Sequence, residues 1–286
     1  MKIGIDSYCF HRFFGEVYPQ QQPAPFRMTM DDFLDFSKEL GVDGVSLESC
    51  FFPSFDDAYL ADLKAKLDEY GFDRVYAWGH PDGLERGQNP GEFRDMIASI
   101  DRAVAIGADV MRVVGCSHMY RLEPHGPQID ALVAQFREAA PIAEAAGVKL
   151  AVENHIDFTA AEMVRMIEAV GSPNFGINFD TGNFLRLLDD PVKGMDALAP
   201  YTFATHIKDL KVNPDAAPDD WFFFSSVPVG DGLIDNEALA RKLEEAGYEG
   251  FLAAETDFLH PDYGDDEHAA ARKSVAALKK IAASLA

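Results

Sequence analysis

The chain has few cysteines, few basic residues relative to its acidic content, and no long apolar run. Cys9, Cys50 and Cys116 form no CxxC pair and have no metal-site spacing, which disfavours a disulfide framework and a thiolate zinc site. There are 25 Lys and Arg residues against 48 Asp and Glu residues, so the formal net charge is −23. Such a charge repels phosphate backbones and anionic lipid, and nucleic acid is therefore excluded as a general partner.

Signals for secretion or membrane insertion are also missing. No stretch of about 18 apolar residues is present, which is the length that a membrane span needs. The opening MKIGIDSYCF lacks the charged segment and the apolar run of a signal peptide. We therefore expect a cytoplasmic protein with reduced thiols and no membrane partner.

One pattern recurs along the chain: an amphipathic helix, a Gly, and a β-branched run, as in SKELGVDGVSLE and AEAAGVKLAVE. The Gly suits a helix C-cap, and a run that is apolar on both faces is typical of a buried parallel strand. Strands are predicted near 2–6, 43–48, 73–79, 109–115, 148–153, 174–179, 203–207 and 250–255. Helices are predicted near 30–40, 57–70, 92–106, 128–146, 159–170, 191–199, 235–246 and 265–284.

Eight βα units predict a single closed (β/α)8 barrel over residues 1–286. The alternative is an open doubly wound sheet, which is disfavoured because no G-x-G-x-x-G follows the first strand. Two long loops are predicted, at about 8–29 and 210–234, and both follow a strand. They should lie on the catalytic face of the barrel, as lids or binding walls.

Four polar residues end four successive strands: Glu153 in LAVENH, Asp180 in INFDTGN, His206 in ATHIKD and Glu255 in LAAETD. The carboxyl ends of barrel strands meet at one face, and buried acids at such density are costly unless a cation neutralises them. Three oxygen donors and one nitrogen favour Mn²⁺ or Mg²⁺, with Co²⁺ and Zn²⁺ as alternatives. The competing interpretation is that these acids pair with Arg, Lys or helix N-termini.

Residues two apart on a strand point the same way, so His155 should accompany Glu153, and Lys208 should accompany His206. His155 is a candidate acid or base, or else a hydrogen-bond partner of the metal ligands. Arg112, in mid-strand, is expected to pair with a core acid. The candidates for substrate contact are Lys208, Asn183, His118, His80, Glu48 and Trp221.

Aromatic residues gather in the loops after strands one, two and seven: Phe13, Phe14, Phe51, Phe52 and residues 221–224. If these loops share one rim, it is aromatic and acidic. Such a rim suits an uncharged sugar or a sugar joined to an aromatic aglycone, or else a subunit interface. We therefore expect a small sugar or glycoside substrate, and either a homo-oligomer or a complex with a small second subunit.

The order Glu, Asp, His, Glu at the ends of strands five to eight resembles the xylose isomerase-like barrel superfamily. The phrases VENH, FDTGN, HIKD and VGDGLID are similar as well, and the resemblance covers nearly the whole chain. This group includes sugar isomerases, ketose 3-epimerases, dehydratases and endonuclease IV. Asn183 stands where many members carry a His, and a full set of ligands for a multinuclear zinc cluster is missing, which disfavours a hydrolase of the endonuclease IV type.

The resemblance implies proton abstraction next to a metal-bound carbonyl, through an enediolate, with Glu153 and Glu255 as catalytic residues. Return of the proton on the opposite face gives an epimerase, return at the neighbouring carbon gives an isomerase, and loss of a leaving group gives a lyase. We therefore expect a metal-dependent isomerase, epimerase or lyase that acts on an uncharged keto-sugar.

Two alternatives remain open at this point. The catalytic subunits of C-glycoside deglycosidases, in the same superfamily, cleave 3-oxo aryl C-glycosides by elimination and act with a small second subunit. The opening DSYCFHRFFGE is similar to such proteins. The other alternative is a non-catalytic barrel that binds a partner through its aromatic rim.

Overall fold

Eight parallel strands close into a barrel in a computed structural model that describes residues 1–79, 82–217 and 219–285. The order around the barrel is β1-β10-β7-β6-β5-β4-β3-β2, which confirms the predicted (β/α)8 fold. The barrel strands are β1 (Lys2–Asp6), β2 (Gly44–Glu48), β3 (Asp73–Ala77), β4 (Val110–Val114), β5 (Lys149–Glu153), β6 (Phe175–Asp180), β7 (Thr202–Ile207) and β10 (Phe251–Ala254).

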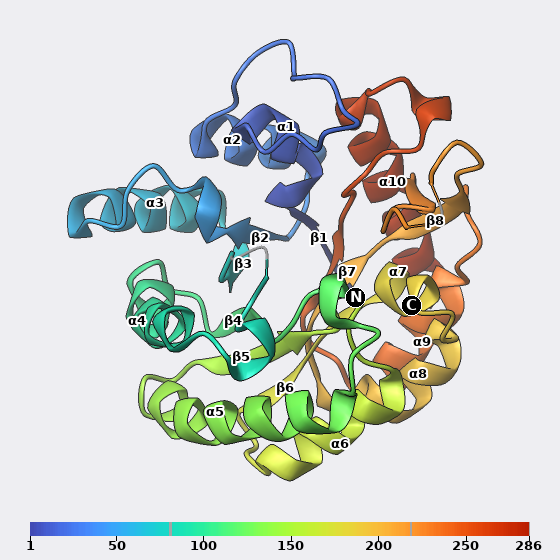
Figure 1. Cartoon of the computed structure of the whole chain (residues 1–286). Helices are drawn as coiled ribbons and strands as arrows, with labels where there is room; N and C mark the ends of the chain where they lie inside the picture. The colour runs from blue at the N-terminus through green and yellow to red at the C-terminus, as the bar shows by residue number, and fades with distance from the viewer. Residues whose placement is uncertain (80–81, 218, 286) are drawn as a thin grey trace.

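Helices surround the barrel as an outer ring (Figure 1). The eight that follow the barrel strands are α2 (Met30–Leu40), α3 (Asp57–Tyr70), α4 (Pro90–Ala105), α5 (His125–Ala145), α6 (Ala160–Val170), α8 (Pro191–Leu198), α9 (Asn236–Glu245) and α10 (Glu267–Leu285). Gly41 and Gly71 follow α2 and α3 in the left-handed region, which confirms the C-caps predicted there.

The two long loops contain structure that the sequence reading did not predict. The first holds a 3₁₀ turn, η1 (Ser7–Phe10), and a short helix, α1 (His11–Phe14). The second holds most of an antiparallel hairpin, β8 (Asp209–Val212) and β9 (Phe224–Val227). A further short helix, α7 (Thr181–Arg186), lies between β6 and α8. These elements are shorter than the roughly 11 to 18 residues over which apolar periodicity can be recognised, so the sequence pattern does not predict them.

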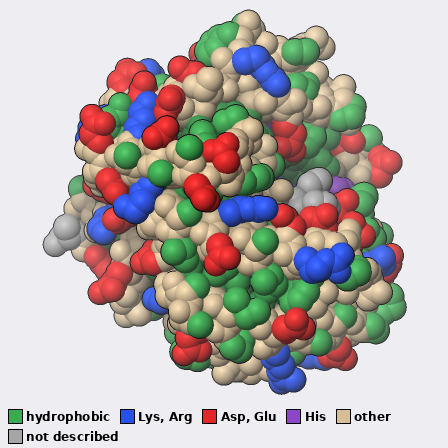
Figure 2. Space-filling model, turned by 90° about the vertical axis from the view of Figure 1, so that its left-hand side faces the viewer, with side chains coloured by type: hydrophobic (Ala, Val, Ile, Leu, Met, Phe, Trp, Pro, Cys, Tyr) green, Lys and Arg blue, Asp and Glu red, His purple; other side chains and the backbone are tan. Residues whose placement is uncertain are grey.

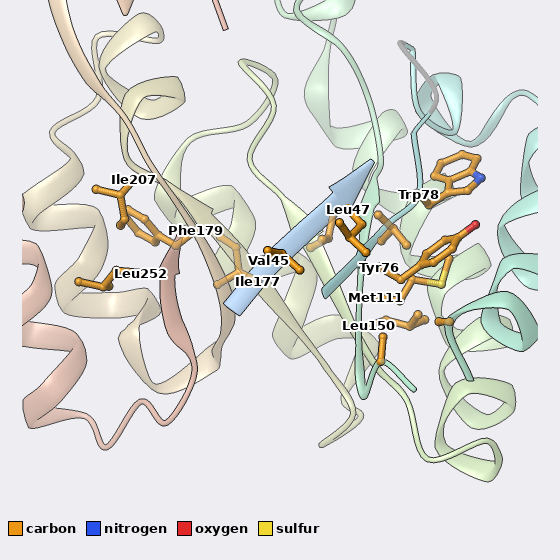
Figure 3. Packing of buried hydrophobic residues seen from close by; sticks show 14 of the residues in the cluster. Val45, Leu47, Tyr76, Trp78, Met111, Leu150, Ile177, Phe179, Ile207 and Leu252 are labelled. Carbon is orange, nitrogen blue, oxygen red and sulfur yellow. The ribbon is translucent and has the colours of Figure 1, made fainter. Parts of the chain in front are cut away.

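Side-chain alternation divides the strand residues into two sets. One set points out of the barrel and packs under the helices (Figure 3). It includes Val45, Leu47, Tyr76, Trp78, Met111, Leu150, Ile177, Phe179, Ile207 and Leu252. The other set faces the barrel interior, where Ala151, Ala204 and Ala253 form a separate small cluster with Val75 and Phe251. Residues two further along the strands from these alanines are Glu153, His206 and Glu255.

The surface is charged and mixed. Figure 2 shows the side of the molecule that carries α3 and α4, where acidic side chains are spread over the face with Lys and Arg side chains between them. Among the described residues, no helix has both the length and the apolar character that a membrane crossing requires.

Phe251 fills the interior at the amino-terminal end of the barrel, between two glycines. A Cβ on Gly4 would lie 2.2 Å from the Phe251 ring, and a Cβ on Gly44 would lie 2.4 Å from it. Both strands therefore require glycine here because the ring occupies the space of a methyl group.

We predict that Gly44→Ala destabilises the fold by about 1–3 kcal/mol, the usual cost of overpacking a buried site. Urea unfolding followed by circular dichroism measures the change. Gly126→Ala in α5 is the control, because a Cβ there meets no atom within 4 Å. The control should leave stability unchanged or raise it by up to about 1 kcal/mol. Equal losses in the two variants would show that the Phe251 contact is not the cause.

Candidate active site

Glu153, Asp180, His206 and Glu255 meet at the carboxyl end of the barrel strands. Glu153 and Asp180 end β5 and β6, His206 lies in register with Asp180 on β7, and Glu255 directly follows β10. One ligand atom from each residue lies within 4.8 Å of the other three. All four side chains are buried, with Glu255 the most exposed at 7%. The structure thus brings together the four residues predicted from the strand ends.

Several polar atoms in this cluster are buried without a hydrogen-bond partner among the described residues: Oε2 of Glu153, both ring nitrogens of His206 and Oε2 of Glu255. They are nevertheless close to one another, since Nδ1 of His206 lies 2.7 Å from Glu255 Oε2 and 3.6 Å from Glu153 Oε1. The atoms converge without the alignment of hydrogen bonds. Buried polar atoms of this kind need a partner, and a divalent cation bonded to one atom of each residue fits the arrangement.

Asp180 is fixed from three directions. Its Oδ1 accepts hydrogen bonds from the N–H groups of Gly182 and Asn183, at 2.8 and 2.9 Å, and so caps α7. Its Oδ2 lies 2.6 Å from Nζ of Lys208. The Asn154 side chain makes two hydrogen bonds, both 2.9 Å, with the Asp180 backbone. Burial raises the pKa of Asp180 to about 7 although the Lys208 ammonium opposes this shift.

Arg112 links two of the candidate residues. Its guanidinium pairs with Glu48 and lies 3.1 Å from Oε2 of Glu153, so Arg112 pairs with core acids as predicted. Burial alone would raise the pKa of Glu153, but Arg112 holds it well below its ordinary value. Glu153 is therefore ionised at neutral pH, and Glu48 is engaged by an arginine rather than free.

A second basic group neutralises the opposite side of the cluster. Nζ of Lys208 lies 3.3 Å from Glu255 and 3.2 Å from Asp257. Arg186 makes a bidentate pair with Asp257, at 2.5 and 2.9 Å, and its guanidinium lies 4.9 Å from the centre of the Trp221 ring. These contacts tie α7 and the end of β10 to the loop that carries Trp221.

A cavity of about 450 Å³ opens beside the cluster, and Glu153 and Glu255 are the two cluster residues that line it. The catalytic candidate His155 lines it as well. Five predicted substrate-contact residues also do so: Glu48, His118, Asn183, Lys208 and Trp221. The sixth, His80, lies outside the described residues.

Both described histidines of the cavity wall have a lowered pKa. Burial lowers the pKa of His118 to about 4, and burial also lowers the pKa of His155. Nδ1 of His155 is buried without a partner among the described residues. Both imidazoles are therefore favoured in the neutral form, in which one ring nitrogen can accept a proton and the other donates a hydrogen bond.

Several residues around the cluster and the cavity were not predicted from the sequence. Asp6 is fully buried, with Oδ2 3.2 Å from Nε2 of His206. It ends β1 as Glu153 ends β5, so the same strand-end rule could have found it. Arg186 and Asp257 were not among the predicted site residues, and neither were two tyrosines that line the cavity, Tyr8 and Tyr18.

The predicted aromatic rim is only partly correct. Phe13, Phe52 and Phe222 are buried at 3%, 8% and 4% exposure, because they pack into the core instead of facing the cavity. Trp221 does line the cavity. The aromatic wall is completed by Tyr8 and Tyr18, whose hydroxyl groups are hydrogen-bonded to each other.

We predict that Asp180→Asn removes tight divalent-metal binding, because an amide supplies one neutral oxygen where the site needs an anion. Metal content after dialysis against Mn²⁺, measured by mass spectrometry, checks this. Asp190→Asn is a matched control: Asp190 caps α8 through two backbone N–H groups as Asp180 caps α7, but it lies half-exposed outside the cluster. Equal metal retention in both variants would argue against the proposed ligand set.

Known proteins share this architecture. A 127-residue segment, 44% of this chain, is 28% identical to the 3-oxo-isoapionate decarboxylase of Pectobacterium atrosepticum and spans 45% of that relative. The fold is similar to that of L-ribulose 3-epimerase, with a TM-score of 0.74 and 18% identity over 99% of this chain and 95% of the other. It is also similar to 3-keto-D-glucoside 4-epimerase from E. coli, with a TM-score of 0.70 and 19% identity over 98% and 99% of the two chains.

These two structural likenesses establish a shared fold. The sequence profile of the xylose isomerase-like TIM barrel family matches residues 34–281, which is most of the chain. The chain therefore belongs to the xylose isomerase-like TIM barrel family.

Proposed function

We propose that the protein is a divalent-metal-dependent isomerase, epimerase or lyase that moves a proton next to the carbonyl group of an uncharged keto-sugar. The observation that carries this proposal is the position of the cluster. Four potential ligand atoms lie within 4.8 Å of one another, and two of the four residues also face a cavity of about 450 Å³. A site that holds only a structural ion has no need of such a cavity.

The cluster offers the cation three carboxylates and one imidazole, from Glu153, Asp180, His206 and Glu255. This donor set suits Mn²⁺ best, with Mg²⁺, Co²⁺ and Zn²⁺ as alternatives. When bound, the cation supplies Lewis-acid polarisation of a substrate carbonyl. Asp180 and His206 do not line the cavity, which assigns them to metal binding alone.

Glu153 and Glu255 are the proposed proton carriers. They come from β5 and the end of β10, which are separated in the barrel by β6 and β7, so they approach the substrate from different sides. One carboxylate removes the proton from carbon, and the other returns a proton that it has first taken up from solvent. Return on the opposite face inverts that carbon, whereas return at the neighbouring carbon exchanges ketose and aldose.

The charges in the cavity support an uncharged substrate. Among the described residues that line it, Arg112, Arg186 and Lys208 are each paired with carboxylates. A phosphate group would need an unpaired basic side chain. The names of two similar proteins, 3-oxo-isoapionate decarboxylase and 3-keto-D-glucoside 4-epimerase, both describe substrates with a keto group, which supports a keto-sugar.

A second candidate is cleavage of a 3-oxo aryl C-glycoside. The aromatic wall of Tyr8, Tyr18 and Trp221 favours it, because such side chains pack well against a planar aglycone. The 3-oxo group acidifies the hydrogen on C2. Loss of that proton to a carboxylate expels the aryl group from C1, and the aryl carbon takes the N–H proton of neutral His155 while the other ring nitrogen takes up a proton from water. This role of His155 is part of the proposal.

We further propose that the enzyme is cytoplasmic and acts as a homo-oligomer or with a small second subunit. Two apolar side chains in the loop that follows β4 support a partner surface: Met119 and Leu122 are 55% and 88% exposed. An endonuclease IV-type activity stays disfavoured, because the described residues contain a single metal-binding cluster. The alternative of a non-catalytic barrel is tested by the following experiment, in which it predicts no exchange.

We predict that the Mn²⁺-loaded protein, incubated in D₂O with ketoses, inososes and 3-oxo-glycosides, incorporates deuterium next to the carbonyl of its substrate. Mass spectrometry reads both the deuterium and the product. Glu255→Gln should slow exchange by at least about 10²-fold, because an amide cannot accept the proton. Glu245→Gln, at the exposed end of α9, is the control and should behave as the wild type.

The product assigns the reaction type. Deuterium in a recovered sugar indicates an isomerase or epimerase, and a freed aglycone indicates a lyase. Exchange that persists in Glu255→Gln would remove this residue from the mechanism. No exchange with any compound, with or without a second subunit, would leave the non-catalytic barrel.

A further inference from the structure

The turn after β5 holds a β-branched residue in the left-handed region. Ile156 has a φ of 58°, a conformation that is a genuine outlier for such a side chain because of its branched Cβ. Ile156 is 6% exposed and lines the cavity, directly after His155. Backbone strain of this kind persists only where the surroundings enforce it, and it is concentrated at functional sites.

The surroundings of this turn do enforce it. The N–H groups of His155 and Phe158 both donate to Oδ1 of Asp157, each at 2.8 Å, and Asp157 is 1% exposed. Before the turn, Asn154 is bonded twice to the Asp180 backbone. After it, a capping box at Thr159 starts α6. The turn is therefore clamped at both ends and braced inside by one buried carboxylate.

The His155 ring has no comparable support. Its Nδ1 is buried without a partner, and no side chain among the described residues accepts a hydrogen bond from the ring. A catalytic imidazole is commonly oriented by a hydrogen bond to the nitrogen that does not react. In this cavity the orientation of the ring has to come from the backbone and from packing.

We propose that the β5–α6 turn, residues 154–159, fixes the direction of the His155 imidazole toward the substrate cavity, with Ile156 and Asp157 as positioning residues. This inference rests on the proposed function, because it assumes that His155 acts on the substrate. The strained φ of Ile156 and the Asp157 bond to the His155 N–H together set the backbone from which the ring projects. Relaxing either one frees the ring to rotate while the metal ligands stay in place.

Two pairs of variants separate backbone geometry from side-chain contact. Ile156→Gly releases the left-handed constraint, whereas Ile156→Asn removes the apolar contact but tolerates the same φ. Asp157→Ala removes the brace, whereas Asp157→Asn keeps its accepting oxygen. Leu188→Gly is the matched control, since Leu188 also has a φ of 58° but is 80% exposed and does not line the cavity.

The primary readout is the state of the ring itself. Long-range ¹H–¹⁵N spectra of the Mg²⁺-loaded protein, with His155 assigned through His155→Gln, should show one set of ring signals in the wild type. Ile156→Gly and Asp157→Ala should broaden or double this set, while Ile156→Asn, Asp157→Asn and Leu188→Gly should preserve it. Unchanged signals in Ile156→Gly and Asp157→Ala would overturn the proposal.

Turnover and metal content give the second readout. In the D₂O assay Ile156→Gly should lose about 10- to 100-fold in kcat, the scale expected when a reacting group is misplaced. Ile156→Asn should keep most of the activity, KM should change little, and bound metal should stay at the wild-type level. Equal losses in Ile156→Gly and Ile156→Asn would assign the effect to apolar contact instead. If the wild type itself shows no exchange, the proposed function fails, and the ring spectra still decide the positioning inference.

Discussion

An excess of buried negative charge at one end of the barrel is the constraint on which the rest of the structure depends. The buried acids there are Asp6, Glu48, Glu153, Asp157, Asp180, Glu255 and Asp257. Arg112, Arg186 and Lys208 are the buried basic side chains that pair with them. Carboxylates outnumber these bases by more than two to one, and unpaired buried charge is among the most costly features of a folded protein. The divalent cation of the proposed function would therefore contribute to the charge balance of the folded state as well as to the chemistry.

The fold supplies the conditions for this concentration of charge. Alternation along the strands sends large apolar side chains outward to the helices, and small ones, such as Ala151 and Ala204, inward. Beyond them the same inward-facing register places Glu153 and His206 at the strand ends. Phe251 fills the barrel interior below. Each of these strands is largely apolar along its length and carries a polar or charged residue at its carboxyl end, so the barrel has a polar site at one end and an apolar core.

The sequence predicts the barrel and the cluster of four strand-end residues well because both depend on local rules. Glycine caps and apolar runs mark each βα unit, and Glu153 or Asp180 is visible as the first acid after such a run. Arg186 and Asp257 are 71 residues apart and meet only in the folded chain, through a helix too short to recognise. Neighbouring aromatics such as Phe13 cannot be assigned to core or cavity from composition, because packing decides their direction.

The two proposed proton carriers stand in different electrostatic surroundings, which bears on their order of action. Arg112 keeps Glu153 ionised by lowering its pKa, and a carboxylate stabilised in this way is a weak base. Glu255 lines the cavity from the other side, with the Lys208 ammonium 3.3 Å from Oε1 and Nδ1 of His206 2.7 Å from Oε2. We therefore expect removal of the carbon-bound proton to fall to Glu255. Under the proposed function, Glu153 and His155, on β5 and the turn after it, face the opposite side of the substrate. Because Glu153 is ionised and His155 is neutral, the proton that is returned there, or that goes to a leaving group, has to be taken up from water first. If the positioning proposal holds, the strained turn acts in that second half of the proposed reaction.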